Sequence, residues 1–420
     1  MAEEKKNIPK LRFREFTGDN ANAWELRKLG NISKTKRGLT YKPSNIDNTG
    51  IRVLRSSNIK EDTFVISDDD VFVKESAVNI PFVENGDILI TAANGSTNLV
   101  GKHAIIRDIP KNSAVHGGFM LITTSKEYEF LNALMSSNWY KKFIKKYVVG
   151  GNGAIGNLRK NDLDNQKIYV PKKDEQKKIG NFFKMLDSLI TLHQRMLDEY
   201  KTLKKTMLSK MFPKNSEKYP ELRFSGFTDA WELRKLGNIS KTKRGLTYKP
   251  SNIDNTGIRV LRSSNIKEDT FVISDDDVFV KESAVNIPFV ENGDILITAA
   301  NGSTNLVGKH AIIRDIPKNS AVHGGFMLIT TSKEYEFLNA LMSSNWYKKF
   351  IKKYVVGGNG AIGNLRKNDL DNQKIYVPKK DEQKKIGNFF KMLDSLITLH
   401  QRELELLKTL KKTMLQQMFV

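Results

Sequence analysis

The sequence contains no cysteine. This absence excludes disulfide bonds and thiolate-ligated zinc or iron–sulfur sites. None of the 11 prolines stands next to another, so the Asn/Asp-Pro-Pro-aromatic motif of an amino-methylating enzyme is absent. The phosphate-binding pattern G-x-x-x-x-G-K-[ST] also fails, because Gly101-Lys102 is followed by His103. The chain itself therefore offers no methyl-transfer or ATP-hydrolysing motif.

Long apolar runs are missing as well. No stretch approaches the roughly 18 residues that a membrane-spanning helix needs. The opening residues MAEEKKNIPK lack the apolar segment of a signal peptide. We expect a cytoplasmic protein without a membrane partner.

Acidic residues are in short supply relative to basic ones. The 420 residues include 69 Lys and Arg but 47 Asp and Glu, which gives a formal net charge of +22. A surface of this charge attracts polyanions, so nucleic acid is the first partner to consider. The hydrophobic content of 39% is sufficient for packed cores in two or three domains.

The chain is an internal duplication. Residues 23–195 are identical to residues 230–402, at a constant offset of 207. The flanking segments differ, with PKLRFREFTGDNANAW at 9–24 matched by the shorter PELRFSGFTDAW at 220–231. Identity without a single substitution indicates a recent duplication, gene conversion or an engineered repeat.

Each copy contains a mixed α/β segment followed by a long helix. Short runs rich in Val, Ile, Phe and Thr, such as IRVLR, DILIT and GFMLIT, indicate strands, whereas EYEFLNALMSSNWYKKFIKKY indicates a helix. In that helix we expect Trp139, Phe143 and Tyr147 in the core, and its lysines either on DNA phosphates or on plain surface. After Pro171, apolar residues recur in steps of three and four for over four heptads, which predicts a helix of roughly 50 Å.

A helix with such an apolar stripe needs a partner, so we expect the two long helices to pair antiparallel as a coiled coil, with a pseudo-two-fold relation between the copies. The predicted divisions are a first domain at 1–172, a spacer helix at 173–212, a linker at 213–220, a second domain at 221–379 and a second spacer helix at 380–420.

Polar and basic loops between the predicted strands are candidates for DNA contact. SKTKRGLTYK (33–42) offers cations for phosphates plus Thr and Tyr for a base. RSSNIK (55–60) and AANGSTNLVGKH (92–103) offer residue types that read base edges. Solvated surface is the alternative for each loop. The first-copy candidates are Lys36, Arg37, Thr40, Tyr41, Lys42, Arg55, Ser57, Asn58, Asn94, Ser96, Thr97, Asn98, Lys102, Asn152, Asn157, Arg159 and Lys160, and the second-copy candidates are Lys243, Arg244, Thr247, Tyr248, Lys249, Arg262, Ser264, Asn265, Asn301, Ser303, Thr304, Asn305, Lys309, Asn359, Asn364, Arg366 and Lys367.

The last of these candidates lie in the repeated stretch GGNGAIGNLRKNDL, at 150–163 and 357–370. Its glycines satisfy G-x-G-x-x-G, but a predicted basic helix precedes them, whereas a dinucleotide fingerprint follows a strand and opens a helix. We therefore interpret the stretch as a DNA-contacting loop, with a purely structural turn as the alternative.

Two further patterns have plain interpretations. Asp68, Asp69 and Asp70 lack the spacing of an EF-hand and are interpreted as a solvated turn, and His116 has no neighbours at metal-ligand spacing. His193 and His400 occupy the same position of the heptad seam. We hypothesise that they pair and fix the coiled-coil register, and a tolerated, half-exposed histidine is the alternative.

Taken in order, these features resemble the specificity subunits of Type I restriction-modification systems. The resemblance covers essentially the whole chain and is carried in each copy by Trp24-Glu25 with Leu29-Gly30, by GDILIT (86–91) and by PKKDEQKKI (171–179). It implies two target-recognition domains on double-stranded DNA, each reading half of a split site. It further implies the docking of two DNA-adenine methyltransferase subunits and of restriction subunits.

We therefore expect a non-catalytic subunit, without metal or cofactor of its own. S-adenosylmethionine, ATP and magnesium are expected in the partner subunits. Because the two domains are the same, an interrupted palindrome is the predicted site. A stand-alone two-fold repressor is the alternative function, and a nuclease with an unrecognised site is a third.

Overall fold

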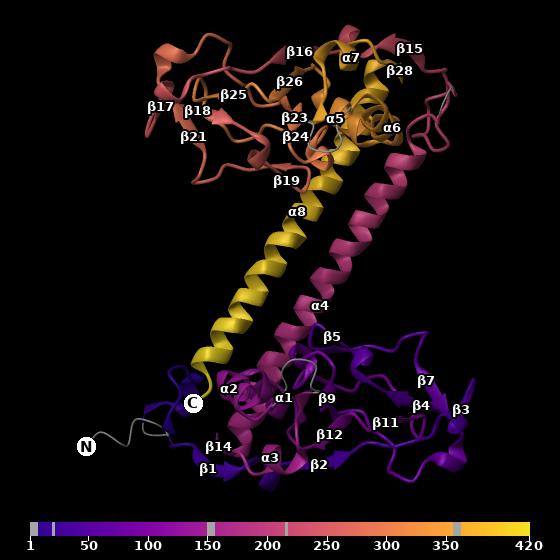
Figure 1. Ribbon diagram of the computed structural model, residues 1–420, viewed down its shortest axis with the longest axis vertical. Coiled ribbons are helices and arrows are strands. Elements are labelled where there is room, and N and C mark those ends of the chain that lie inside the picture. Colours follow the sequence, from indigo (N-terminus) through magenta and orange to yellow (C-terminus); the bar gives the residue numbers. More distant parts are fainter. Residues whose placement is uncertain (1–6, 19–21, 149–155, 215–216, 356–362) are drawn as a thin grey trace. The chain divides into compact units, whose positions relative to one another are not determined.

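The computed structural model describes residues 7–18, 22–148, 156–214, 217–355 and 363–420. The chain divides into two compact units, residues 1–194 with 402–420 and residues 195–401. Each unit contains one copy of a mixed α/β domain (Figure 1), which confirms the predicted fold class.

The first domain contains two four-stranded sheets. In one, the order is β10-β8-β12-β2, with all neighbours antiparallel. In the other, the order is β11-β4-β7-β3, and β11 is parallel to β4. The strands of these sheets are β2 (Lys34–Arg37), β3 (Ile46–Asp47), β4 (Ile51–Leu54), β7 (Val71–Val73), β8 (Ile88–Thr91), β10 (His103–Ile105), β11 (Ala114–His116) and β12 (Met120–Thr124).

Three strand pairs and three short α-helices also lie in the described part of this domain. The pairs are β1 (Glu25–Lys28) with β14 (Lys167–Val170), β5 (Ile59–Lys60) with β6 (Thr63–Phe64), and β9 (Ala93–Asn94) with β13 (Gly156–Asn157). The helices are α1 (Tyr128–Ser136), α2 (Asn138–Tyr147) and α3 (Lys160–Asp164).

The predicted helical segment over 127–147 consists of two helices. Ser137 has an extended backbone, with φ −81° and ψ 177°, and separates α1 from α2. Its hydroxyl donates to the Leu134 carbonyl at 2.7 Å, a local bond that competes with helix continuation. The expected core role of the aromatics in α2 is confirmed, since Phe143 is buried and Trp139 and Tyr147 pack against the same core.

The second domain repeats this architecture. Its strands are β15 (Glu232–Lys235), β16 (Lys241–Arg244), β17 (Ile253–Asp254), β18 (Ile258–Leu261), β19 (Ile266–Lys267), β20 (Thr270–Phe271), β21 (Val278–Val280), β22 (Ile295–Thr298), β23 (Ala300–Asn301), β24 (His310–Ile312), β25 (Ala321–His323), β26 (Met327–Thr331), β27 (Gly363–Asn364) and β28 (Lys374–Val377), and its helices are α5 (Tyr335–Ser343), α6 (Asn345–Tyr354) and α7 (Lys367–Asp371).

Two long helices of 38 residues each follow the domains: α4 (Lys173–Lys210) and α8 (Lys380–Gln417). Within the first unit, Lys411 of α8 forms an ion pair with Asp187 of α4 at 2.6 Å, and Phe419 packs on Phe183. Within the second unit, Lys204 pairs with Asp394 at 2.6 Å. Of these two contacts in the first unit, the one further along the α8 chain, at Phe419, meets the earlier residue of α4, Phe183, whereas Lys411 meets Asp187. The two chain segments therefore run antiparallel there.

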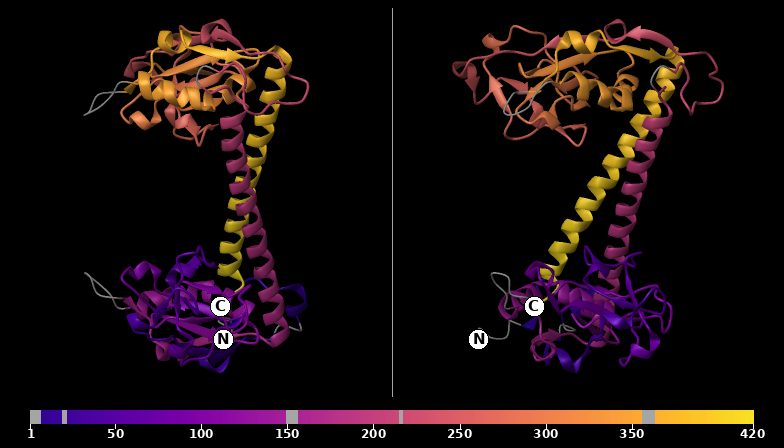
Figure 2. Two further views of the ribbon diagram at one scale, coloured as in Figure 1. Left: turned by 90° about the vertical axis from the view of Figure 1, so that its right-hand side faces the viewer. Right: turned by 45° about the vertical axis from the view of Figure 1, so that its right-hand side comes forward.

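The end of each long helix completes the core of the other copy's domain. Met418 and Phe419, just beyond α8, are buried in the core of the first domain together with Trp24 and Phe130. Met211 and Phe212, just beyond α4, are buried in the equivalent core of the second domain. The C-terminal end of α8 reaches the first domain in every view of Figures 1 and 2. The core of the first domain therefore combines residues about 400 positions apart in the chain, Trp24 and Phe419.

The N-terminal flanks are fastened to the start of the long helices. Arg12 donates from Nε and Nη2 to the two carboxylate oxygens of Glu175, at 2.8 and 2.6 Å, and both side chains are almost fully buried. Arg223 makes the same bidentate contact with Glu382. Among the described residues, no helix is both long enough and apolar enough to cross a membrane.

Candidate nucleic-acid interface

The candidate loops gather at one end of the sheet that contains β8, β12 and β2. Met120 at the start of β12 lies opposite Thr91 at the end of β8, and Leu121 lies opposite Arg37 at the end of β2. The segments that follow β8 and β2 and the segment that precedes β12 therefore lie at the same end of the sheet.

A tight turn at residues 117–119 joins these segments. The Leu39 amide donates to the His116 carbonyl at 2.7 Å, and a Cβ on Gly38 would lie 2.0 Å from the Gly117 carbonyl oxygen. On its other side, the Phe119 carbonyl accepts the amides of Ala92 and Ala93, at 2.9 and 3.0 Å. The turn thus holds the 38–42 loop and the 92–98 loop to one another.

Two more segments meet the same place. Strands β9 and β13 pair with Asn94 opposite Gly156, and the Leu158 amide donates to the Ala92 carbonyl at 2.7 Å. The Asn94 side chain donates to the Ser56 hydroxyl at 3.2 Å. We name the five segments 38–42, 55–58, 92–98, 117–119 and 156–159 the loop cluster. The second domain has the same cluster, with equivalent bonds.

Most of the predicted contact residues in the described part of the chain are solvent-accessible. The exposed ones are Arg37, Thr40, Lys42, Ser96, Thr97, Asn98, Lys102, Asn157 and Arg159, their counterparts Arg244, Thr247, Lys249, Ser303, Thr304, Asn305, Lys309, Asn364 and Arg366, and also Lys243. The half-buried ones are Lys36, Tyr41, Arg55, Ser57, Asn94 and Lys160, with Tyr248, Arg262, Ser264, Asn301 and Lys367 in the second copy. Hydroxyls and amides match the hydrogen-bonding edges of bases, and the cations match phosphates.

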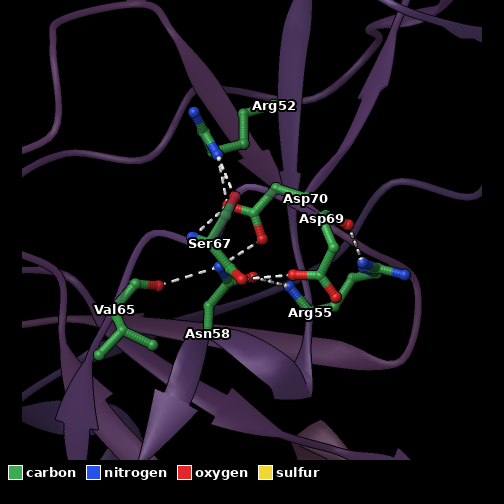
Figure 3. Close-up of polar contacts among 7 residues, drawn as sticks. All are labelled: Arg52, Arg55, Asn58, Val65, Ser67, Asp69 and Asp70. Carbon is green, nitrogen blue, oxygen red and sulfur yellow. Dashed lines mark hydrogen bonds and ion pairs between the residues drawn. The ribbon is translucent and has the colours of Figure 1, made fainter. Parts of the chain in front are cut away.

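Asn58 and Asn265 are the exceptions, and their prediction is wrong in this conformation. Asn58 has 0% exposure, and its Nδ2 donates to the Val65 carbonyl at 3.0 Å and to Asp70 at 2.8 Å. Its Oδ1 accepts the Arg55 amide at 2.7 Å (Figure 3). With these bonds made inside the protein, Asn58 shapes the loop and is not available to a base.

The interpretation of the three aspartates as a solvated turn is wrong for Asp70. Its side chain is buried, where it accepts Arg52 as an ion pair and the Ser67 amide at 3.1 Å (Figure 3). Arg55 donates from Nη2 to the Asp69 carbonyl at 2.9 Å, which positions this guanidinium at the edge of the loop cluster. No group of His, Asp and Glu that could hold a metal ion occurs among the described residues.

Several candidates have structural contacts that the sequence did not indicate. Lys36 and Arg37 were expected in a loop but belong to strand β2, because the segment pairs with β12. Tyr41 packs its ring against a small core around Val53. Lys160 forms an ion pair with Asp164 at 2.5 Å, as Lys367 does with Asp371 at 2.6 Å. Asn152 and Asn359 lie outside the described residues.

The two seam histidines belong to different units. His400 is buried and stacks on Tyr200, with ring centroids 5.5 Å apart. The position that corresponds to Tyr200 in the other copy is Leu407. The register role of His193 and His400 stays a prediction.

Phe119 and Phe326 are not among the contact residues predicted from the sequence. Each is 69% exposed and lies in the turn at the centre of its loop cluster. The preceding Gly117-Gly118 pair could have indicated a tight turn with an exposed residue. The run GFMLIT predicts a strand throughout, whereas the strand begins at Met120.

Behind the turn, His116 is buried. Its Nε2 lies 3.3 Å from the Lys36 carbonyl oxygen, and its Nδ1 is without a hydrogen-bond partner. Burial disfavours the charged ring and lowers the pKa of His116 to about 4. The imidazole is therefore neutral at pH 7 and serves as an uncharged support for the loop cluster.

The fold is that of a duplicated protein that presents the same polar loop cluster from each of two domains. The chain matches the family described as Type I restriction modification DNA specificity domain over residues 22–202 and again over 228–409, and it belongs to that family. The resemblance seen in the sequence is thereby confirmed.

Similar proteins match nearly the whole length of this chain. The putative type I restriction enzyme MjaX specificity subunit of Methanocaldococcus jannaschii is 25% identical over 97% of this chain and 95% of its own length. The type I restriction enzyme EcoKI specificity subunit of Escherichia coli K12 is 24% identical over 88% of this chain and 82% of its own. The crystal structure of the S subunit from M. genitalium matches 98% of this chain and 99% of its own with a TM-score of 0.61, at 18% identity.

Proposed function

We propose that this chain selects the DNA sequence for a Type I restriction-modification complex by reading one half-site with each domain. The observation that carries the proposal is the duplicated loop cluster, in which exposed cations surround hydroxyl and amide side chains that suit base edges. Family membership and a net charge of +22 support the same partner.

We further propose that the two half-sites are identical and inverted, so that the target is an interrupted palindrome. The support is the identity of residues 23–195 and 230–402. Helices α4 and α8, each shared between the two units, would set the spacing between the half-sites. A 38-residue helix is about 57 Å long, or about 1.6 turns of B-DNA.

Methyl transfer and cleavage are assigned to partner subunits in this proposal. The chain would dock two DNA-adenine methyltransferase subunits, which bind S-adenosylmethionine, and restriction subunits, which use ATP and magnesium. An apolar surface for a helical partner is present on the long helices: Met185 and Leu192 on α4 and Met392, Leu399 and Leu406 on α8 recur at seven-residue spacing and are 50–58% exposed. Such stripes usually mark protein interfaces.

Selection from a library of random duplexes tests the proposal. The chain is assembled with its methyltransferase subunits, bound duplexes are sequenced, and adenine methylation is measured on the enriched site. One short sequence, inverted across a constant spacer, is expected. Two unlike half-sites, or a direct repeat, would contradict the palindrome, and enrichment by the isolated chain with no methyltransferase in the complex would favour a repressor.

The docking surface has its own test. Replacing Met185 and Met392 with Glu is expected to abolish co-purification with the methyltransferase while leaving the thermal unfolding midpoint within about 2 °C, since both residues are surface-exposed. Replacing Lys111 and Lys318 with Glu, on an exposed turn of each domain, is the control. Unchanged co-purification of the methionine variant would remove this stripe from the interface.

A further inference from the structure

An exposed aromatic ring stands at the centre of each loop cluster. Of the large apolar side chains in the described ranges, Phe119 and Phe326 are the most exposed, both at 69%. The side chains around them are polar: Thr40 lies beside Gly118, and Asn94 follows the Ala92–Ala93 pair that is bonded to Phe119. A large apolar group left in water amid polar neighbours indicates a contact surface for something else.

The ring projects from a fixed backbone. The Phe119 carbonyl accepts the amides of Ala92 and Ala93, and the Met120 amide donates to the Gly117 carbonyl at 2.8 Å. The Gly117 amide in turn donates to the Leu54 carbonyl at 2.9 Å, on a neighbouring sheet. Because the backbone is held on three sides, only the two side-chain torsions of Phe119 remain to be ordered, and a contact costs little conformational entropy.

The width of the interface identifies the groove that it fits. The loop cluster extends from the ends of β8, β12 and β2, which are neighbours in one sheet. Strands lie about 4.8 Å apart, so their ends alone span about 10 Å. This is too wide for the minor groove of B-DNA, at about 6 Å, and matches the major groove, at about 12 Å.

In the major groove of undistorted DNA, hydrogen-bonding atoms surround one kind of apolar group, the C5-methyl group of thymine. The loop cluster has the complementary composition, with one apolar ring among hydroxyls and amides. Insertion of the ring between base pairs would cost a few kcal/mol of unstacking and is typical of minor-groove binders. We infer that Phe119 and Phe326 each contact a thymine methyl group in the half-site, an inference that rests on the proposed function.

Deoxyuridine differs from thymidine only in lacking this methyl group, so replacing one by the other tests the methyl contact alone. The complex with methyltransferase is first used to select its site from random duplexes. Each thymidine of that site is then replaced singly by deoxyuridine in both half-sites. We expect one position at which binding by the wild-type complex weakens about fourfold per half-site, or about 15-fold for both, as burial of one methyl group predicts.

The phenylalanine variants decide which residue makes the contact. Phe119→Ala with Phe326→Ala is expected to weaken binding to the thymidine duplex and to be insensitive to deoxyuridine at that position, while Phe119→Leu with Phe326→Leu keeps part of the sensitivity. Leu26→Ala with Leu233→Ala is the control, because these exposed apolar residues lie on β1 and β15, outside the loop cluster, and it should retain the wild-type response.

Three results would overturn the inference. A wild-type complex that tolerates deoxyuridine at every position excludes the methyl contact, and alanine variants that remain as sensitive as the wild type assign it to another residue. Alanine variants that lose the methyltransferase during co-purification identify the ring as a protein contact. If the wild-type complex enriches no site at all, the proposed function itself fails. A complex that enriches a site but tolerates deoxyuridine at every position contradicts only the methyl contact.

Discussion

The ring of Phe419 lies 6.1 Å from the indole of Trp24, at an interplanar angle of 83°, so the end of α8 closes the core of the first domain. Phe419 also packs on Phe130 and Phe183, with ring centroids 5.9 and 5.8 Å away. The second domain has the same arrangement, since Phe212 lies 6.1 Å from Trp231. Each domain therefore depends on a helix that belongs to the other copy.

We expect Phe419→Ala to destabilise the first unit by about 3 kcal/mol, because it removes a buried aromatic ring and leaves a cavity among Trp24, Phe130 and Phe183. Chemical denaturation followed by tryptophan fluorescence measures the loss. Phe119→Ala makes the same chemical change at an exposed position and should cost less than about 1 kcal/mol. Equal losses in the two variants would show that Phe419 does not complete the core.

The Arg12–Glu175 ion pair allows a second test, because both side chains are at most 4% exposed. Arg12→Met leaves the Glu175 carboxylate buried without a cation, and we expect a loss of about 3 kcal/mol. Arg195 and Glu199 form the matched surface pair, at 77% and 61% exposure, and Arg195→Met should cost less than about 0.5 kcal/mol. A double-mutant cycle with Glu175→Gln measures the coupling, and a coupling near zero would contradict a structural role for the buried pair.

Much of the architecture follows from the sequence, because it depends on local patterns. The heptad steps predict α4 and α8, and the alternation of Val, Ile and Thr predicts strands such as β8 and β12. Leu203 and Leu410 fall on the predicted three-and-four spacing of the seam, but both remain more than a third exposed. The helices end at Lys210 and Gln417, just before the buried pairs Met211–Phe212 and Met418–Phe419.

Features that depend on distant partners could not be predicted. Nothing near Phe419 indicates that it packs on Trp24, almost 400 residues earlier in the chain. Asn58 is of a residue type that often contacts DNA bases, and only its burial against Asp70 shows that it does not face outward. Phe119 is of a residue type that usually lies in the core, and only the turn at Gly117 exposes it. Residue type predicts the loops of the proposed interface, whereas tertiary contacts decide which of their side chains face outward.

The close approach at Gly38 makes the loop cluster sensitive to one methyl group. A Cβ there would lie 2.0 Å from the Gly117 carbonyl oxygen, so the backbone must shift. We expect Gly38→Ala with Gly245→Ala to lower stability by about 3 kcal/mol and to abolish specific DNA binding. Gly95 and Gly302 have nothing within 4 Å of the added carbon, and their alanine variants should unfold like the wild type. Normal unfolding of the Gly38 variant would mean that the turn adapts.

The buried histidines predict a pH dependence of stability. The pKa of an unfolded histidine is about 6.5, whereas the pKa of His116 and of His323 is lowered to about 4. Between these values the unfolded chain binds protons that the folded chain does not, so stability falls as pH decreases through this window. The expected contribution is about 2 kcal/mol per domain between pH 7.5 and pH 5.

Replacing both histidines with Gln isolates this contribution from that of the carboxylates. The double variant should lose less stability than the wild type between pH 7.5 and pH 5, as measured by urea denaturation at each pH. Parallel curves for the two proteins would show that His116 and His323 titrate normally in the folded state.

Arg37 and Arg244 are expected to hold DNA phosphates, since both are exposed at the strand end where the loop cluster begins. Each phosphate contact contributes about 0.9 to the slope of log K against log salt concentration, so changing both residues to Ala should reduce the slope by about 2. Phosphate contacts do not read sequence, so affinity for the selected site and for an unrelated duplex should fall by a similar factor. Lys111→Ala with Lys318→Ala removes the same charge from exposed turns beyond the opposite ends of β11 and β25 and should leave the slope unchanged. A loss confined to the selected site would instead make Arg37 and Arg244 base-reading residues, and an unchanged slope would remove them from the interface.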